Sequence, residues 1–76
     1  MKLVPIESSM LQAVGSDRET RELEAVFQSG QVWRYLDVPR KVYTELLEAP
    51  SKGQYMRENV IHVYADYRVS RPRRRA

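Results

Sequence analysis

The stretch QVWRYLDVP, residues 31–39, holds the only tryptophan of the chain and decides how its sheet can form. Side chains two positions apart in a strand share a face, so Trp33 and Tyr35 point to one side and Arg34 to the other. Two large aromatic side chains on one sheet face form either part of a hydrophobic core or a platform for stacking nucleic-acid bases. The register of the hairpin that precedes this stretch distinguishes the two arrangements.

The strand before the turn is predicted at residues 20–28, TRELEAVFQ, where apolar and polar side chains alternate. With a two-residue loop at residues 29–30, Trp33 and Tyr35 would face away from the apolar side of this strand. The same register would place Arg34 in the core row, where an unpaired charge is costly.

A three-residue loop at residues 28–30, with Gly30 at positive φ, gives the opposite arrangement. It pairs the two strands as follows: Leu23 with Tyr35, Glu24 with Arg34, and Ala25 with Trp33. Burying two aromatic side chains removes about 150–250 Å² each from water, worth roughly several kcal/mol. We therefore predict this register, with both aromatics in the core and the Glu24–Arg34 pair on the outer face. A position for Tyr35 at the rim of the core, with one edge exposed, stays open.

The other segments predict a small α+β domain. The expected elements are a strand at residues 12–16, strands at 20–28 and 31–38, a helix from Pro39 to residue 49, a second helix after Ser51, and an extended segment at 61–64. Apolar residues recur at helical spacing in the first helix, and Ser51 with Gln54 resembles a capping box for the second. The expected architecture is a three-stranded antiparallel β-meander followed by two short helices (β-β-β-α-α) packed on one face.

Length and composition exclude several classes of protein. A chain of 76 residues forms at most one domain, with a small core and a stability of about 3–5 kcal/mol. The absence of cysteine excludes disulfides and thiolate metal sites. The first ten residues lack the apolar run of roughly 7–15 residues of a signal peptide, and no segment approaches the roughly 20 residues of a membrane span. We expect a cytoplasmic protein without a membrane partner.

The charge of the chain is divided unevenly. Five of the 13 basic side chains lie in the last nine residues, RVSRPRRRA, which contain no acid. Residues 1–67 then hold 8 basic and 10 acidic side chains, a balance of −2. Such a block of like charges with proline is typical of a disordered segment. We therefore divide the chain into one domain, residues 1–67, and a basic tail, residues 68–76, that either attracts polyanions or is simply solvated.

Candidate catalytic and metal-binding groups are few. His62 is the only histidine, and it lacks both the partners of a catalytic triad and a set of metal ligands near it in the sequence. Ser8 and Ser9 have no general base close by and no nucleophile-elbow glycines. We expect a protein that is not an enzyme and that holds no metal and no cofactor.

The start of the second helix is the one candidate anion site within the domain. Lys52 and Gly53 fall in its first turn, where free backbone N–H groups attract phosphate. In the alternative interpretation Ser51 caps the helix, Gly53 allows close packing, and Lys52 is solvated; capping alone accounts for Ser51 and Gln54.

The segments SSMLQAVGSD, LEAVF, GQVWRYLDVP, VYTELLEAPSKGQY and ENV resemble, in order and spacing, the KTSC family. The resemblance covers roughly residues 4–67. In the family's aromatic-x-aromatic motif Trp33 stands in place of the more usual tyrosine, while Tyr35 is retained. Met56-Arg57 replaces the usual Phe-Asn, and Val60-Ile61 replaces the usual Ile-Arg. Because the family is named for the C-terminus of some bacterial lysyl-tRNA synthetases, the resemblance implies a possible association with RNA.

Two functions follow from these observations. The first is a small RNA-binding module for tRNA or single-stranded RNA, which uses aromatics, a helix N-terminus and the basic tail. Its candidate residues are Tyr35, Lys52, Gly53, Tyr64, Tyr67, Arg68, Arg71, Arg73, Arg74 and Arg75. The second is a protein-interaction adaptor, since a meander leaves two strand edges open to a partner strand.

Overall fold

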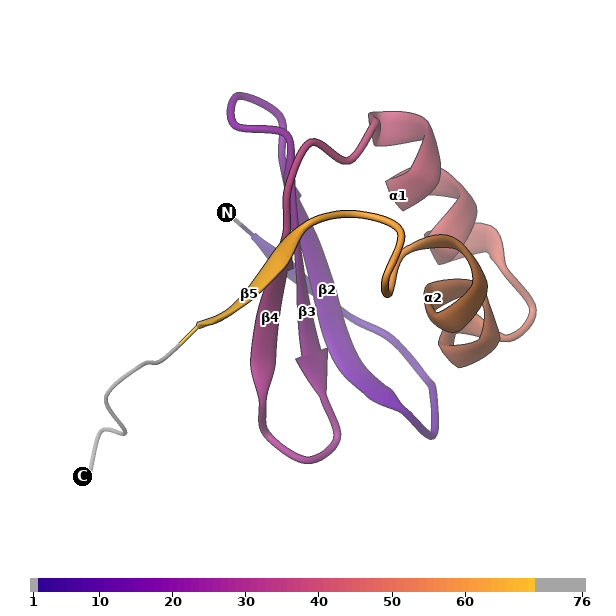
Figure 1. Cartoon of the computed structure of the whole chain (residues 1–76). Helices are drawn as coiled ribbons and strands as arrows, with labels where there is room; N and C mark the ends of the chain where they lie inside the picture. The colour runs from indigo at the N-terminus through magenta and orange to yellow at the C-terminus, as the bar shows by residue number, and fades with distance from the viewer. Residues whose placement is uncertain (1, 70–76) are drawn as a thin grey trace.

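The computed structural model describes residues 2–69 as one sheet with two helices on one of its faces (Figure 1). The elements in chain order are β1 (Leu3–Pro5), β2 (Leu11–Asp17), β3 (Glu22–Phe27), β4 (Val32–Tyr35), α1 (Arg40–Glu48), α2 (Lys52–Asn59) and β5 (Asp66–Val69). Within this range the sheet has five strands in the order β1-β2-β3-β4-β5, and every neighbouring pair is antiparallel. The α+β class is confirmed.

The prediction of three strands is wrong. It misses β1, which is only three residues long, contains Pro5 and lies at one edge of the sheet. It also places the last extended segment too early, because residues 61–64 form turns after α2 and β5 begins at Asp66. Short edge strands carry little signal of their own, since their pairing depends on the neighbouring strand. Arg68, assigned above to the tail, lies inside β5.

The three-residue hairpin loop is confirmed. Gly30 has a φ of +94°, and its N–H donates to the carbonyl of Phe27 at 2.9 Å. Leu23 pairs with Tyr35, Glu24 with Arg34, and Ala25 with Trp33. The aromatic positions of β4 therefore face the helices.

The core lies between the helices and the covered face of the sheet. Its buried members are Leu11, Val14, Leu23, Ala25, Tyr35, Val38, Tyr43, Leu46, Met56 and Val60. From α1, Tyr43 and Leu46 are buried, as the helical spacing of its apolar residues predicts. This small set includes side chains from every described element except β1 and β5, so the domain depends on all of them at once.

The start of α2 follows the capping interpretation, except that Lys52 is half-buried against the carbonyl of Ala49 instead of solvated. The Ser51 hydroxyl accepts a hydrogen bond from the N–H of Gln54 at 3.3 Å, which confirms Ser51 as the cap. Gly53 is buried, and a Cβ there would lie 3.2 Å from the side chain of Met10. Gly53 therefore lets α2 approach the segment before β2. No helix among residues 2–69 is both long and apolar enough to cross a membrane.

The opposite face of the sheet carries an ion-pair network. Arg34 donates from Nε to Glu24 at 2.8 Å and from Nη1 to Glu22 at 3.0 Å. The cross-strand pair of Glu24 with Arg34 is thus confirmed, but Glu24 is only 1% exposed, which the alternation of polar residues does not predict. We call this surface the open face, because no helix covers it (Figure 1).

Candidate functional site

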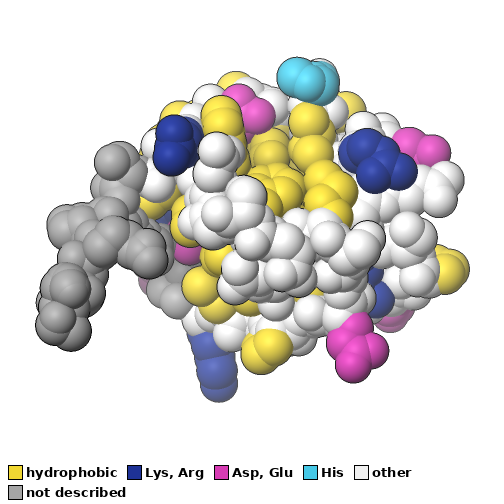
Figure 2. Space-filling model, turned by 90° about the horizontal axis from the view of Figure 1, so that it is seen from below, with side chains coloured by type: hydrophobic (Ala, Val, Ile, Leu, Met, Phe, Trp, Pro, Cys, Tyr) yellow, Lys and Arg dark blue, Asp and Glu magenta, His cyan; other side chains and the backbone are white. Residues whose placement is uncertain are grey.

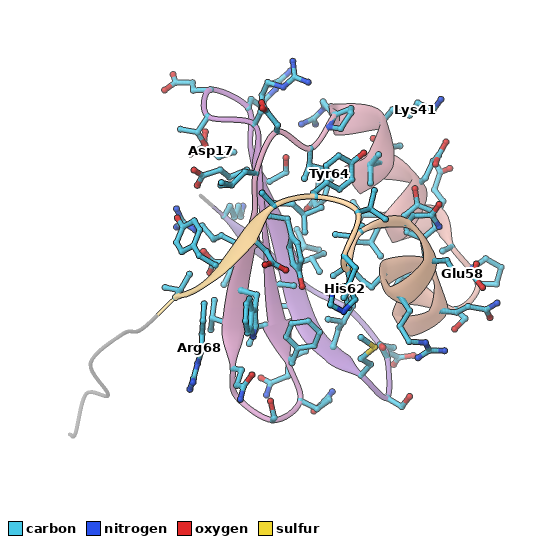
Figure 3. All side chains as sticks on the ribbon, viewed as in Figure 1. Asp17, Lys41, Glu58, His62, Tyr64 and Arg68 are labelled. Carbon is cyan, nitrogen blue, oxygen red and sulfur yellow. The ribbon has the colours of Figure 1, made fainter. Side chains whose placement is uncertain are left out.

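A shallow hollow of about 220 Å³ lies where the β3–β4 hairpin meets the segment between α2 and β5. It is lined by Phe27, Trp33, Tyr35, Ile61, His62 and Asp66. We call it the aromatic hollow. Figure 2 shows hydrophobic side chains reaching the molecular surface beside the histidine, and Figure 3 shows His62 between the sheet and α2.

The hairpin supplies one side of the aromatic hollow. Phe27 is two positions beyond Ala25, which pairs with Trp33, so Phe27 and Trp33 share the covered face. Both are partly buried and pack against the core. The indole Nε1–H of Trp33 donates to Oε1 of Gln31 at 3.1 Å, which orients the ring at the rim. The chain's only tryptophan is therefore neither fully internal nor free in solvent.

The end of α2 supplies the other side. The N–H groups of Val60 and Ile61 both donate to the carbonyl of Met56, at 3.0 and 2.8 Å, and close the helix. The chain then turns at His62, whose φ is +66°. A left-handed residue is common after a helix, where it redirects the chain. This turn places the exposed imidazole of His62 beside the rings of β3 and β4.

Tyr35 forms the inner wall of the aromatic hollow rather than a stacking surface. It is only 2% exposed, which confirms its predicted place in the core. Burial, and secondarily the negative charge of Asp66, raises the pKa of Tyr35 to about 12. The phenol therefore stays neutral at physiological pH and contributes an apolar wall with one polar tip.

One arginine lies next to the hollow. Arg68 of β5 pairs directly with Trp33 of β4, and directly opposed residues on neighbouring strands project to the same face. The side chain of Arg68 is exposed (Figure 3). A guanidinium beside an exposed indole edge is a combination suited to a planar, electron-rich or anionic ligand.

The other candidates predicted from the sequence do not meet at this site. The Lys52 ammonium donates to the carbonyl of Ala49 at 2.9 Å, and Gly53 packs closely against Met10. Tyr64 packs against the core. Tyr67 is 44% exposed but pairs with Arg34, on the open face. Arg71, Arg73, Arg74 and Arg75 lie outside the described residues.

The sequence analysis missed several residues of the aromatic hollow: Phe27, Ile61, His62 and Asp66. For Phe27 a signal was present, because the predicted register already places it beside Trp33 on the covered face. For the other three there was none, since only the turn after α2 brings them to the hairpin. Among residues 2–69 there is no group of three His, Cys, Asp or Glu side chains that could hold a metal ion.

The structure is a small α+β domain with an aromatic hollow at its surface. The model of the KTSC domain family matches residues 7–64, so the chain belongs to the KTSC family. It is similar to the crystal structure of a KTSC domain protein from Yersinia pestis, with a TM-score of 0.88 and 25% identity, covering 91% of this chain and 97% of that one.

Curated relatives occur both alone and within a larger protein. An uncharacterized protein of Stutzerimonas stutzeri is 43% identical over 58 residues, which cover 76% of this chain and 82% of that protein. A lysine–tRNA ligase of Nostoc sp. is 42% identical over 53 residues, or 70% of this chain. The match spans only 9% of the length of that ligase.

Proposed function

We propose that this chain is a small RNA-binding module that holds an unpaired base in the aromatic hollow. The observation that carries the proposal is the convergence of Trp33, Phe27 and His62 at one accessible hollow, with Arg68 beside the indole. Proteins that bind single-stranded nucleic acid combine exposed rings, on which bases stack, with basic side chains for the backbone. RNA recognition targets unpaired bases in the same way.

The size of the hollow supports a single planar group. Its volume of about 220 Å³ is below the roughly 300–1,000 Å³ of sites that enclose drug-sized ligands. Asp66 and the tip of Tyr35 supply polar atoms at its edge, and the rings supply the stacking surface. One base therefore fits this chemistry better than an extended apolar ligand.

The relatives support RNA as the partner. Lysine–tRNA ligases of Nostoc sp., Nostoc punctiforme and Trichormus variabilis each contain a segment 38–42% identical to this chain. As their name states, these whole enzymes join lysine to tRNA. A domain that binds an unpaired tRNA base is consistent with that setting, and the same domain on its own would bind RNA in trans.

The test is a titration of fluorescently labelled single-stranded RNA and of tRNA with the full chain, at two salt concentrations. We expect binding that weakens with salt, because backbone contacts release counterions. Trp33→Leu and His62→Ala should each weaken binding by about 1–3 kcal/mol, the usual contribution of one stacked base. Tyr67→Leu is the matched control, since it removes an exposed ring from the opposite face.

Three outcomes would overturn the proposal. One is no binding by the intact chain at low salt. Another is unchanged binding in both hollow variants. The third is complete loss of binding when residues 70–76 are deleted, with Arg68 retained, because affinity would then come from charge outside the hollow.

A second function, that of a protein-interaction adaptor, rests on β5. This strand is an edge of the sheet formed by residues 2–69, and Asp66, Tyr67 and Arg68 are exposed. An open edge can pair with a strand of another protein. If it does, a partner should remain bound at high salt after nuclease treatment, and the amides of β5 should become protected from hydrogen exchange. A partner that leaves those amides unprotected argues against this alternative.

A further inference from the structure

A second pocket, of about 260 Å³, lies between the β2–β3 turn and the start of α1. Its lining consists of Ser16, Asp17, Arg18, Arg21, Val38 and Arg40. We call it the arginine pocket. None of these residues lines the aromatic hollow. In Figure 3 its end of the molecule is at the top, with Asp17 near the turn and Lys41 on α1.

Backbone hydrogen bonds hold the two segments of the arginine pocket together. The N–H of Arg21 donates to the carbonyl of Asp17 at 2.8 Å and closes the turn. The N–H of Val38, two residues before α1, donates to the carbonyl of Arg21 at 2.9 Å. Arg40 is the first residue of α1. The fold therefore brings Arg40 to the same pocket as Arg18 and Arg21 of the turn.

These arginines have no partners within the domain. Among residues 2–69, the side chains of Arg18, Arg21 and Arg40 form no ion pair and donate no hydrogen bond, whereas Arg34 forms both. The carboxylate in the lining, Asp17, accepts hydrogen bonds from the N–H groups of Glu19 and Thr20 at 2.9 and 3.2 Å. Three positive charges around one pocket repel each other, and an anion between them would relieve that repulsion.

Arg21 also has an unusual backbone conformation for an arginine. Its φ is +61°, in the left-handed region that glycine adopts without cost and that a long side chain adopts with strain. Residues held in such conformations cluster at functional sites, where the strain is retained for a purpose. The turn that Arg21 closes accounts for this φ, but a glycine or asparagine would adopt it with less strain than an arginine.

We propose that Arg18, Arg21 and Arg40 bind a phosphate group. The guanidinium is planar and matches a phosphate through two parallel hydrogen bonds, which makes arginine suited to this ligand. The nine-residue helix α1 begins at Arg40, and its positive end adds to the attraction. The ligand is either a phosphate monoester, such as the terminus of a nucleotide, or the diester of an RNA backbone. The site does not depend on the aromatic hollow.

The first experiment is an NMR titration of the labelled full chain with inorganic phosphate, uridine 5′-monophosphate and uridine at constant ionic strength. Phosphate and the nucleotide should shift the amides of residues 17–21 and of Val38, Arg40 and Lys41, and uridine should not. An RNA oligonucleotide without a terminal phosphate distinguishes the two kinds of phosphate ligand. If it shifts the same amides, the site binds the diester of an RNA backbone; if it does not, the site binds a phosphate monoester. The absence of shifts at these amides with every phosphate-containing probe rules out the site.

Variants test the arginines themselves. Arg18→Gln with Arg40→Gln should weaken phosphate binding at least about tenfold, because it removes charged hydrogen bonds. Lys2→Gln with Arg57→Gln removes the same charge elsewhere and should change affinity far less. If both double variants lose the same amount of phosphate affinity, the effect comes from overall charge, and a specific site is refuted.

Arg21→Gly separates binding from folding. Glycine relieves the positive φ, so the melting temperature should rise while phosphate affinity falls. Unchanged affinity in this variant would contradict the role of Arg21. Trp33→Leu should leave phosphate binding intact, so a failure of the base-binding proposal and a failure of the phosphate site give different results.

Discussion

Two adjacent residues on opposite faces of the sheet are buried to nearly the same degree although one side chain is apolar and the other charged. On the covered face, Leu23 is 0% exposed beneath the helices. On the open face, the next residue, Glu24, is 1% exposed although no helix lies over it. Adjacent residues of β3 thus occupy a hydrophobic and a charged environment, each shielded from water.

This difference shows that two separate kinds of interaction stabilise buried side chains in this domain. Leu23 is stabilised by the transfer of apolar surface out of water. A buried carboxylate is tolerated only with a charged and hydrogen-bonded partner, which Arg34 supplies at 2.8 Å. The hydrogen bonds to Glu24 and Glu22 in turn raise the pKa of Arg34, so the guanidinium stays charged at any physiological pH. Three substitutions separate these two kinds of interaction, and we take them in order of expected effect.

Leu23→Ala should cause the largest loss. Removing a fully buried leucine side chain leaves a cavity and costs about 2–5 kcal/mol in the free energy of unfolding. For a domain of this size that is most of the stability. Urea denaturation followed by circular dichroism measures the change. A loss well under about 1 kcal/mol would mean that the covered face collapses around the gap and that burial of Leu23 contributes little to stability.

Arg34→Met should cost somewhat less, roughly 2–3 kcal/mol at neutral pH. Breaking a buried ion pair by removing one partner costs about 3–5 kcal/mol, but the Arg34 side chain is 28% exposed, so the effect is reduced. Adding Glu24→Gln should recover part of the loss, because the charge left without its guanidinium is removed. If the double variant is no more stable than Arg34→Met, the network contributes through packing rather than through charge.

Tyr35→Phe should have the smallest effect at neutral pH, because the Tyr35 hydroxyl has no hydrogen-bond partner among residues 2–69. Its effect appears in alkali. The pKa of Tyr35 is raised to about 12 in the folded chain, mainly by burial, so between pH 10 and 12 the unfolded chain loses the phenol proton first and folding becomes less favourable. The stability that Tyr35 contributes is present below its unfolded pKa and is lost as pH rises through that window.

In Tyr35→Phe the alkaline decline should therefore be shallower than in the unaltered chain, by an amount on the order of 1–2 kcal/mol near pH 11.5. Denaturation curves at a series of pH values measure it. Tyr55, whose pKa is also raised to about 12 by burial and by its hydrogen bond to Glu45, accounts for part of the remaining decline. Identical pH profiles for the two proteins would show that Tyr35 ionises as easily folded as unfolded.

The sequence by itself determined the central hairpin, the two helices and the α+β class. These features are local: alternation predicts the faces of β3 and β4, Gly30 sets the loop, and Ser51 caps α2. The family likewise follows from ordered motifs along the chain. Such signals are readable because each depends on residues within a few positions of one another.

Only the tertiary structure decided the rest. The edge strands β1 and β5 exist because β2 and β4 offer them partners, and Glu24 is buried because Arg34 lies across it. Both pockets combine segments that are distant in the sequence. The turn after α2 brings His62 to the same hollow as Trp33. The hydrogen bond between Val38 and Arg21 holds the start of α1, with Arg40, beside the β2–β3 turn. The side chains that line each pocket become neighbours only when the helices pack on the sheet, so their proximity cannot be read from the sequence.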